Sequence, residues 1–317
     1  MAISLAEYAD ELAQSSLRWP KAPDPVAVTA KPLSKPLPGI RGVIWNLYGT
    51  LLNITDGEFT FEPAQEIRLQ VALDKTIHQF NMWNSMTRKP GAPWEYFIHK
   101  YRDVLSNLKM RGGPRGSVTE VDAVEIWDRL IAQLEQKDYA WDIPQYGDRD
   151  QYCEKIAYFF HSSLQGVGPY KDALAILKHV KKKQMHQGLL ADAQSFSLVQ
   201  LLRCLVTQGK LVPLNQLLDM DLLTLSYREG IRKPSSQLFD AAVRRCQSCG
   251  LEPDQVLYVS SRLRGDLELA RGFGFKTVLF AGDKSSLEAS QTLLKDPKTR
   301  PDRLVTELTQ VSRIISY

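Results

Sequence analysis

The sequence has few cysteines, no long apolar run and no strong excess of either charge. Four cysteines, and five histidines without matching ligand spacing, predict free thiols rather than a structural zinc site. No run of about 18 apolar residues is present, so we expect no transmembrane helix. A net charge of +4 predicts neither nucleic acid nor an anionic membrane as a partner. The first residues lack the basic start and apolar core of a signal peptide, and a cytoplasmic location is expected.

The 317 residues can bury a sizeable core, and 44% hydrophobic residues is ordinary for a globular protein. Residues 4–17 have apolar side chains at helical spacing, which predicts a short amphipathic helix. Many prolines follow up to residue 38 and favour an extended backbone. We interpret residues 1–40 as this helix and a proline-rich strap on the domain surface, with Trp19 as an anchor. A docking segment for another protein is the alternative.

Residues 59–163 show long helical periodicity. It predicts helices over 64–83, 94–110, 121–135 and 149–164, with a turn at residues 89–93. Ser117 or Thr119 is expected to cap the third helix. From residue 166, short apolar strands alternate with helices, which is typical of a parallel sheet. The expected strands are 43–45, 187–190, 222–226, 256–259 and 276–280, and a helix over 303–315 closes the chain.

The stretch 42–52 reads GVIWNLYGTLL, a buried strand that runs into a tight turn. It closely resembles the first motif of the haloacid dehalogenase-like (HAD) hydrolase superfamily, an apolar strand followed by Asp-x-Asp-Gly-Thr-Leu. In that family the first Asp is the nucleophile and the second is the general acid/base. Asn46 and Tyr48 stand at these positions here. An amide is a very poor nucleophile, and a phenol with an ordinary pKa of about 10 is poorly matched to proton transfer near neutral pH.

Two further segments resemble the second and third motifs, each near the carboxyl end of an expected strand, where parallel sheets bind ligands. Residues 188–193 place Ala191 at the position of the family's phosphate-binding hydroxyl group, and Asp192 beside it. A carboxylate there would repel a phosphate. Residues 230–239 keep the pattern Gly-x-x-Lys-Pro-x-x-x-x-Phe, and Lys233 matches the motif lysine.

The fourth segment, residues 257–266, resembles a strand followed by Gly-Asp-x-x-x-x-Asp. Ser260 and Ser261 occupy the Gly-Asp pair, and Asp266 matches the last Asp. In the family these acids hold Mg²⁺, which needs hard, anionic oxygens. With Asp266 as the one remaining candidate ligand, we expect no cofactor, and Mg²⁺ only if residual family activity persists.

The resemblance covers residues 40–312 and implies the fold. It predicts a Rossmann-like, doubly wound α/β core formed by residues 41–57 and 165–317. Residues 58–164 match the position of the helical C1 cap of subfamily I.

Three functions stay open at this point. The leading hypothesis is a catalytically inactive superfamily member that works as a binding or scaffolding protein. A divergent hydrolase or phosphatase would instead use Tyr48, Asp192 and Asp266 in a rearranged site beneath the cap, and requires a deep, open pocket. A non-catalytic sensor of a small phosphate or carboxylate would cradle the anion with basic and hydroxyl groups: Lys233, Ser260, Ser261, Arg262 and Arg264.

Overall fold

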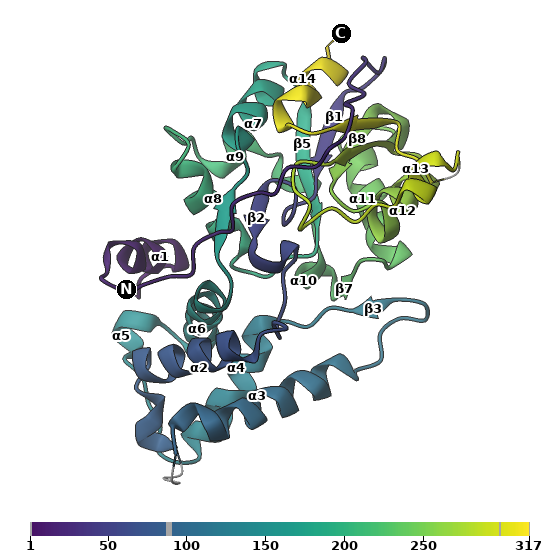
Figure 1. Cartoon of the computed structure of the whole chain (residues 1–317). Coiled ribbons are helices and arrows are strands. Elements are labelled where there is room, and N and C mark those ends of the chain that lie inside the picture. Colours follow the sequence, from purple (N-terminus) through teal and green to yellow (C-terminus); the bar gives the residue numbers. More distant parts are fainter. Residues whose placement is uncertain (1, 87–90, 298, 317) are drawn as a thin grey trace.

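A six-stranded parallel sheet forms the centre of the computed structural model, which describes residues 2–86, 91–297 and 299–316 (Figure 1). The strand order is β10-β9-β8-β1-β5-β6, which is the doubly wound order 3-2-1-4-5-6 when the six strands are counted along the chain. The strands are β1 (Gly42–Trp45), β5 (His186–Ala191), β6 (Leu223–Leu225), β8 (Val256–Ser260), β9 (Lys276–Phe280) and β10 (Arg303–Val305). The predicted α/β fold class is confirmed.

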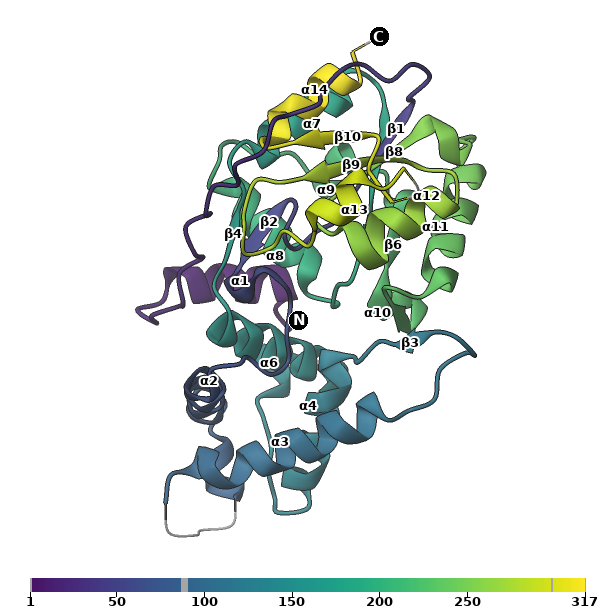
Figure 2. The same ribbon diagram turned by 45° about the vertical axis from the view of Figure 1, so that its right-hand side comes forward.

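Both faces of this sheet are covered by helices (Figure 2). Val43 and Trp45 of β1 belong to the apolar cluster that includes α7 (Ala173–Lys182), α8 (Ser197–Val206), α9 (Leu214–Leu217) and α14 (Val311–Ile314). Ile44, between them, faces the opposite cluster with α11 (Ser236–Ser248) and α12 (Glu268–Gly272). Successive side chains of a strand point to opposite faces, so β1 is apolar at every position because it is buried on both sides.

In the described part of residues 55–166, five α-helices lie below the sheet in Figure 1. They are α2 (Glu66–Gln79), α3 (Pro93–Lys109), α4 (Ala123–Glu135), α5 (Ile143–Tyr146) and α6 (Arg149–Leu164). Their apolar faces form a cluster of their own around Tyr101, Trp127 and Phe160. Residues 89 and 90 of the predicted turn lie outside the described residues. No helix in the described part of the chain is both long and apolar enough to cross a membrane.

Two short antiparallel ladders connect this helical insert to the sheet domain. β2 (Leu52–Ile54) pairs with β4 (Val167–Pro169), where the chain leaves and re-enters the core. β3 (Val118–Thr119) of the insert pairs with β7 (Ile231–Arg232), directly before Lys233. The buried Gln194 side chain adds to this junction, since it accepts from the Ala123 amide and donates to the Val121 carbonyl.

The N-terminal segment packs along the whole molecule. Helix α1 (Leu5–Gln14) is capped by Ser4 and contacts α6 and α8. The Trp19 ring lies edge-on to Phe159, and the extended chain that follows bonds through Leu33 to Leu304 at the edge of the sheet. Figure 1 shows this extended segment as a dark purple trace over the surface of the sheet domain.

Two local predictions are wrong. Helix α4 is capped by Asp122, whose carboxylate accepts from the Val124 amide at 2.8 Å. Ser117 and Thr119 precede it in the β3 segment, where their hydroxyl groups donate to other backbone carbonyls. The closing segment starts as strand β10, because residues 303–305 pair with β9 and extend the sheet; helix begins at residue 308.

We predict that Asp122→Ala lowers the free energy of unfolding by about 1 kcal/mol, because it removes the helix cap. Thr119→Ala is the matched control and should change it by less than about 0.5 kcal/mol. Urea unfolding of the two variants measures both values. Equal losses for the two substitutions would contradict this assignment of the cap.

Candidate functional site

The motif residues meet at the carboxyl edge of the sheet, between β1 and β8. Asn46 directly follows β1, Ser260 ends β8, and Lys233 follows β7. The strand order reverses between β1 and β8, and open α/β sheets bind ligands at such a switch point. The structure therefore brings Asn46, Lys233, Ser260 and Asp266 together at the location expected from the sequence.

The Lys233 ammonium group is buried and fully engaged. Its Nζ atom donates to Asp266 Oδ2 at 2.8 Å and to Asn46 Oδ1 at 3.0 Å, and lies 3.4 Å from the Tyr258 hydroxyl oxygen. An ammonium group has three N–H donors. All three have an acceptor within the protein, which leaves none directed at a ligand.

Three donor groups lie within hydrogen-bond distance of one oxygen of the Asp266 carboxylate. Besides Lys233, Ser260 Oγ donates to Oδ2 at 2.6 Å, and the Tyr258 hydroxyl group, which has one proton, lies 3.2 Å from Oδ2 and 3.1 Å from the Leu190 carbonyl oxygen. Burial, and then the nearby carboxylates of Asp266 and Asp192, raise the pKa of Tyr258, which keeps its phenol a neutral donor. The sequence pattern places position 258 in a strand and gives Tyr258 no role at the site; the available signal was a phenol in an apolar strand, whose buried hydroxyl group needs a partner.

The surroundings of Asn46 favour an amide over a carboxylate. Its Nδ2 donates to the Tyr48 carbonyl oxygen at 3.1 Å and lies 3.4 Å from Ser260 Oγ. An Asp at this position would turn an oxygen lone pair toward that carbonyl. The Asn46 oxygen accepts from Lys233 and its nitrogen donates to the Tyr48 carbonyl, so both ends of the amide have a partner. A carboxylate here would have no donor for that carbonyl.

Tyr48 points away from this cluster. Its hydroxyl group contacts Ser197 Oγ at 2.9 Å and Gln200 Oε1 at 2.6 Å on helix α8, and its ring stacks on Phe59. Burial raises its pKa further above the ordinary value of 10. The nearby His161 is also buried between aromatic rings, which lowers its pKa to about 3 and keeps it neutral.

The other residues singled out by the sequence are placed around the cluster rather than in it. Ala191 ends β5 and packs in the apolar core. Asp192 accepts from the backbone amide of Lys233 and lies 3.6 Å from the Arg232 guanidinium group. Ser261 is buried, and its hydroxyl group has no hydrogen-bond partner within the described residues. A Cβ atom at position 49, where φ is +81°, would come within 2.8 Å of that hydroxyl oxygen, so the turn requires glycine.

Little space remains where a substrate would enter from the cap. The cavity bounded by Asn46, Phe59, Lys233 and Arg262 has a volume of about 20 Å³, which is room for about one water molecule. Arg262 closes it, because its guanidinium group pairs with Glu58 and with Glu288, each at 2.9 Å.

The donor set does not fit Mg²⁺, the cofactor implied by the fold family. Asn46 is neutral, and the Tyr48 carbonyl oxygen already accepts from it. Asp266 has one oxygen saturated by Lys233, Ser260 and Tyr258. The described residues contain no group of three or more His, Cys, Asp or Glu side chains that could hold a metal ion. A magnesium site needs several hard, anionic oxygens, and this cluster offers none that is free of an internal donor except Asp266 Oδ1.

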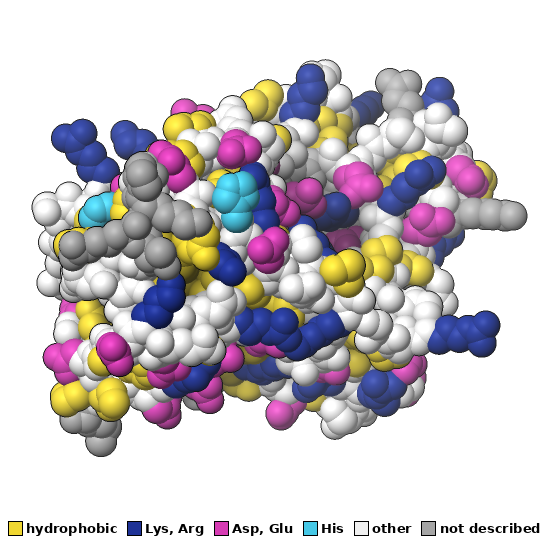
Figure 3. Space-filling view, turned by 90° about the horizontal axis from the view of Figure 1, so that it is seen from below, with side chains coloured by type: hydrophobic (Ala, Val, Ile, Leu, Met, Phe, Trp, Pro, Cys, Tyr) yellow, Lys and Arg dark blue, Asp and Glu magenta, His cyan; other side chains and the backbone are white. Residues whose placement is uncertain are grey.

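A wider hollow of about 510 Å³ lies beside the cluster. Its lining carries four basic and four acidic residues: Arg232, Lys233, Arg262 and Arg264, and Asp192, Asp266, Glu268 and Glu288. Basic and acidic side chains are likewise intermingled over the face shown in Figure 3. The balance of charge gives the hollow no strong preference for an anion.

Glu120 at the end of the β3 segment is a functional-site candidate that sequence reasoning missed. Its backbone amide bonds to the Gly230 carbonyl, and its side chain is partly buried near Asp192 and Arg232. Burial raises its pKa to about 7, Arg232 opposes this rise, and Asp192 adds to it. Nothing in the sequence pattern distinguished this glutamate from a surface residue.

This pKa predicts a pH-dependent stability. The folded-state pKa of about 7 lies above the ordinary glutamate value of 4.5, so the folded protein binds the proton more tightly than the unfolded chain. The contribution of Glu120 to the free energy of unfolding is fully present below pH 4.5 and is lost as the pH rises through 7. Glu120→Gln should remove this loss in urea unfolding measured across that pH range, whereas Glu268→Gln, an exposed control, should keep it. An unchanged pH profile in Glu120→Gln would refute the assignment.

The buried ion pair predicts a large stability effect. Asp266→Asn leaves Lys233 buried without its counter-charge and should cost about 3–5 kcal/mol of unfolding free energy. Asp240→Asn breaks an exposed pair with Arg244 and should cost less than about 0.5 kcal/mol. Both are measured by urea unfolding. A loss below about 1 kcal/mol for Asp266→Asn would contradict the role given to this pair.

Three solved structures match most of this chain at low sequence identity. The chain matches a dehalogenase in an intermediate complex with 18% identity and a TM-score of 0.45, covering 86% of this chain and 96% of that one. It matches the L-2-haloacid dehalogenase from Xanthobacter autotrophicus with chloropropionic acid covalently bound at 19% identity and TM-score 0.43, covering 86% and 97%. CbbY from Rhodobacter sphaeroides in complex with xylulose-1,5-bisphosphate matches with 12% identity and a TM-score of 0.43, covering 85% of this chain and 95% of that one. At these values the likeness says nothing about ligand or reaction.

No curated protein matches the sequence. A family model described as HAD-hydrolase-like matches residues 230–311, which contain the lysine motif, strand β8 and Asp266. The remaining motif segments occur in the family's order along a sheet with the doubly wound strand order. The family match, the motif order and the strand order all fit the haloacid dehalogenase-like superfamily.

Proposed function

We propose that this protein is a catalytically inactive superfamily member that works as a binding or scaffolding protein. The observation that carries the proposal is the internal use of Lys233, whose three donors are all directed at protein oxygens. In the family this lysine holds the phosphate of the substrate. The adjoining cavity of about 20 Å³ supports the same conclusion, because a phosphoryl group does not fit it.

Each chemical step of the family lacks its residue here. Asn46 offers an amide in place of the attacking carboxylate, and its nitrogen is already used as a donor. Tyr48 could exchange a proton only with groups on α8, and burial raises its pKa away from neutrality. These features support a site that is held together for stability rather than for turnover.

The two alternatives have weaker support. A divergent hydrolase requires Tyr48, Asp192 and Asp266 to converge on an open pocket, but the Tyr48 hydroxyl group faces α8 and Asp192 accepts from a backbone amide. An anion sensor requires free basic groups. The hollow beside Lys233 offers Arg264, whereas the other three basic side chains each pair with a carboxylate.

The direct test is hydrolysis of p-nitrophenyl phosphate in the presence of Mg²⁺. We expect no turnover above buffer from the unmodified protein. Asn46→Asp should also remain inactive, since it restores the carboxylate without the acid/base or the metal ligands.

The matched control is Lys233→Met, which removes the ammonium group and keeps most of the side-chain volume. Turnover by the unmodified protein that is lost in Lys233→Met would overturn the proposal. Circular dichroism of each variant shows that an inactive sample is folded.

A further inference from the structure

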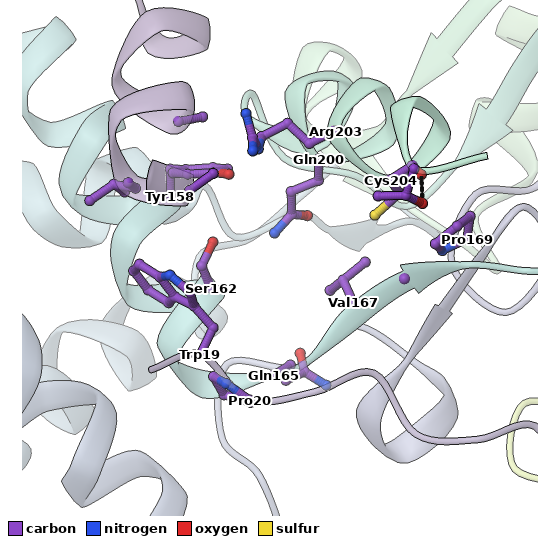
Figure 4. A pocket seen from close by; sticks show the side chains of 15 residues that line it. Trp19, Pro20, Tyr158, Ser162, Gln165, Val167, Pro169, Gln200, Arg203 and Cys204 are labelled. Atoms are coloured by element: carbon purple, nitrogen blue, oxygen red, sulfur yellow. Dashed lines mark hydrogen bonds between the residues drawn. The ribbon is translucent and has the colours of Figure 1, made fainter. Parts of the chain in front are cut away.

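A second cavity lies on the opposite side of Tyr48 from the motif cluster. Its volume is about 370 Å³, within the range of small-molecule sites. Helix α1, the start of the strap at Trp19, the end of α6, strand β4 and helix α8 enclose it (Figure 4). None of the motif residues lines it.

The walls of this cavity are mainly apolar. Leu12 of α1, Trp19 of the strap, and Val167 and Pro169 of β4 face the same space in the structure. Cys204 adds a buried thiol, and burial raises its pKa to about 12, so this group is neutral. Such walls can bind the alkyl or aryl part of a small-molecule ligand.

One amide group in these walls has no partner within the described residues. Gln200 is 6% exposed and lines the cavity, and its amide nitrogen has no hydrogen-bond partner within the described residues. In Figure 4 the side chain extends from α8 toward Ser162. An N–H group that faces a mainly apolar cavity gains a hydrogen bond when a ligand supplies an acceptor, so this amide is suited to an acceptor from outside the chain.

Tyr48 fixes the orientation of that amide. Ser197 Oγ accepts from the Gln194 backbone amide at 2.8 Å, which leaves the Ser197 proton for the Tyr48 oxygen 2.9 Å away. The Tyr48 proton is then given to Gln200 Oε1 at 2.6 Å. With its oxygen held in this way, Gln200 presents its NH₂ group to the cavity. The shorter side chain of Asp, which the family has at position 48, would not reach α8.

A positive charge lies at the edge of the same cavity. The Arg203 guanidinium group is 27% exposed and pairs with Asp10 of helix α1, which is 66% exposed. An exposed pair of this kind is weak. The guanidinium group is therefore available to a carboxylate that enters between α1 and α8.

We propose that this cavity binds a small organic acid with an apolar body and a carboxylate head. The apolar walls take the body, and the Gln200 amide and the Arg203 guanidinium group take the carboxylate oxygens. The site is separate from the motif cluster, so this inference holds or fails independently of turnover there.

Calorimetric titration of the full chain with sodium decanoate, below its micellar concentration, tests the proposal. We expect saturable binding, and binding of 1-decanol at least tenfold weaker because it lacks the charged head. Arg203→Met should weaken decanoate binding at least tenfold. Asp10→Asn breaks the same ion pair but keeps the cation, and should bind decanoate as tightly as the unmodified protein or more tightly.

Ala13→Trp is the second variant, because Ala13 is an exposed residue of α1 that lines the cavity and a large ring there fills it. We expect no decanoate binding in this folded variant. Absence of binding by the unmodified protein at millimolar decanoate would overturn the proposal. So would equal affinity for decanol, or binding that survives both Arg203→Met and Ala13→Trp.

Discussion

The ion pair between Lys233 and Asp266 determines how the rest of the site is arranged. Both side chains are buried, and removing two charges from water costs several kcal/mol per ion unless other groups compensate. Asn46, Ser260 and Tyr258 supply that compensation, each with a hydrogen bond to one of the two charges. The replacements at the nucleophile and metal positions thus form one network, in which each neutral group completes the solvation of the pair.

Residues next to this network hold the insert against the sheet domain. Strand β7, which precedes Lys233, pairs with β3 of the insert, and Arg262 after β8 pairs with Glu58 at the start of the insert. Gln194 bonds to two backbone groups ahead of α4. Backbone hydrogen bonds thus fix the insert at its junction with the sheet domain, and the second cavity lies on another side.

Periodicity predicted most of this fold because it reports burial directly. The strands of the sheet other than β10, and helix α6, lie where short apolar runs and helical spacing placed them. Residues 303–305 could not be assigned from local pattern, because their strand conformation comes from pairing with β9. Sequence resemblance also located Asn46, Lys233 and Asp266 at the carboxyl edge of the sheet. The Tyr48 side chain points toward Gln200 because it packs against α8, and no motif encodes that packing.

The central claim is that Lys233 is unavailable to a phosphoryl group. Calorimetric titration with orthovanadate, a phosphate mimic, in the presence of Mg²⁺ tests it most directly. The account predicts no saturable heat, since the ammonium donors are all used within the protein. Saturable binding of orthovanadate that disappears in Lys233→Met would contradict it.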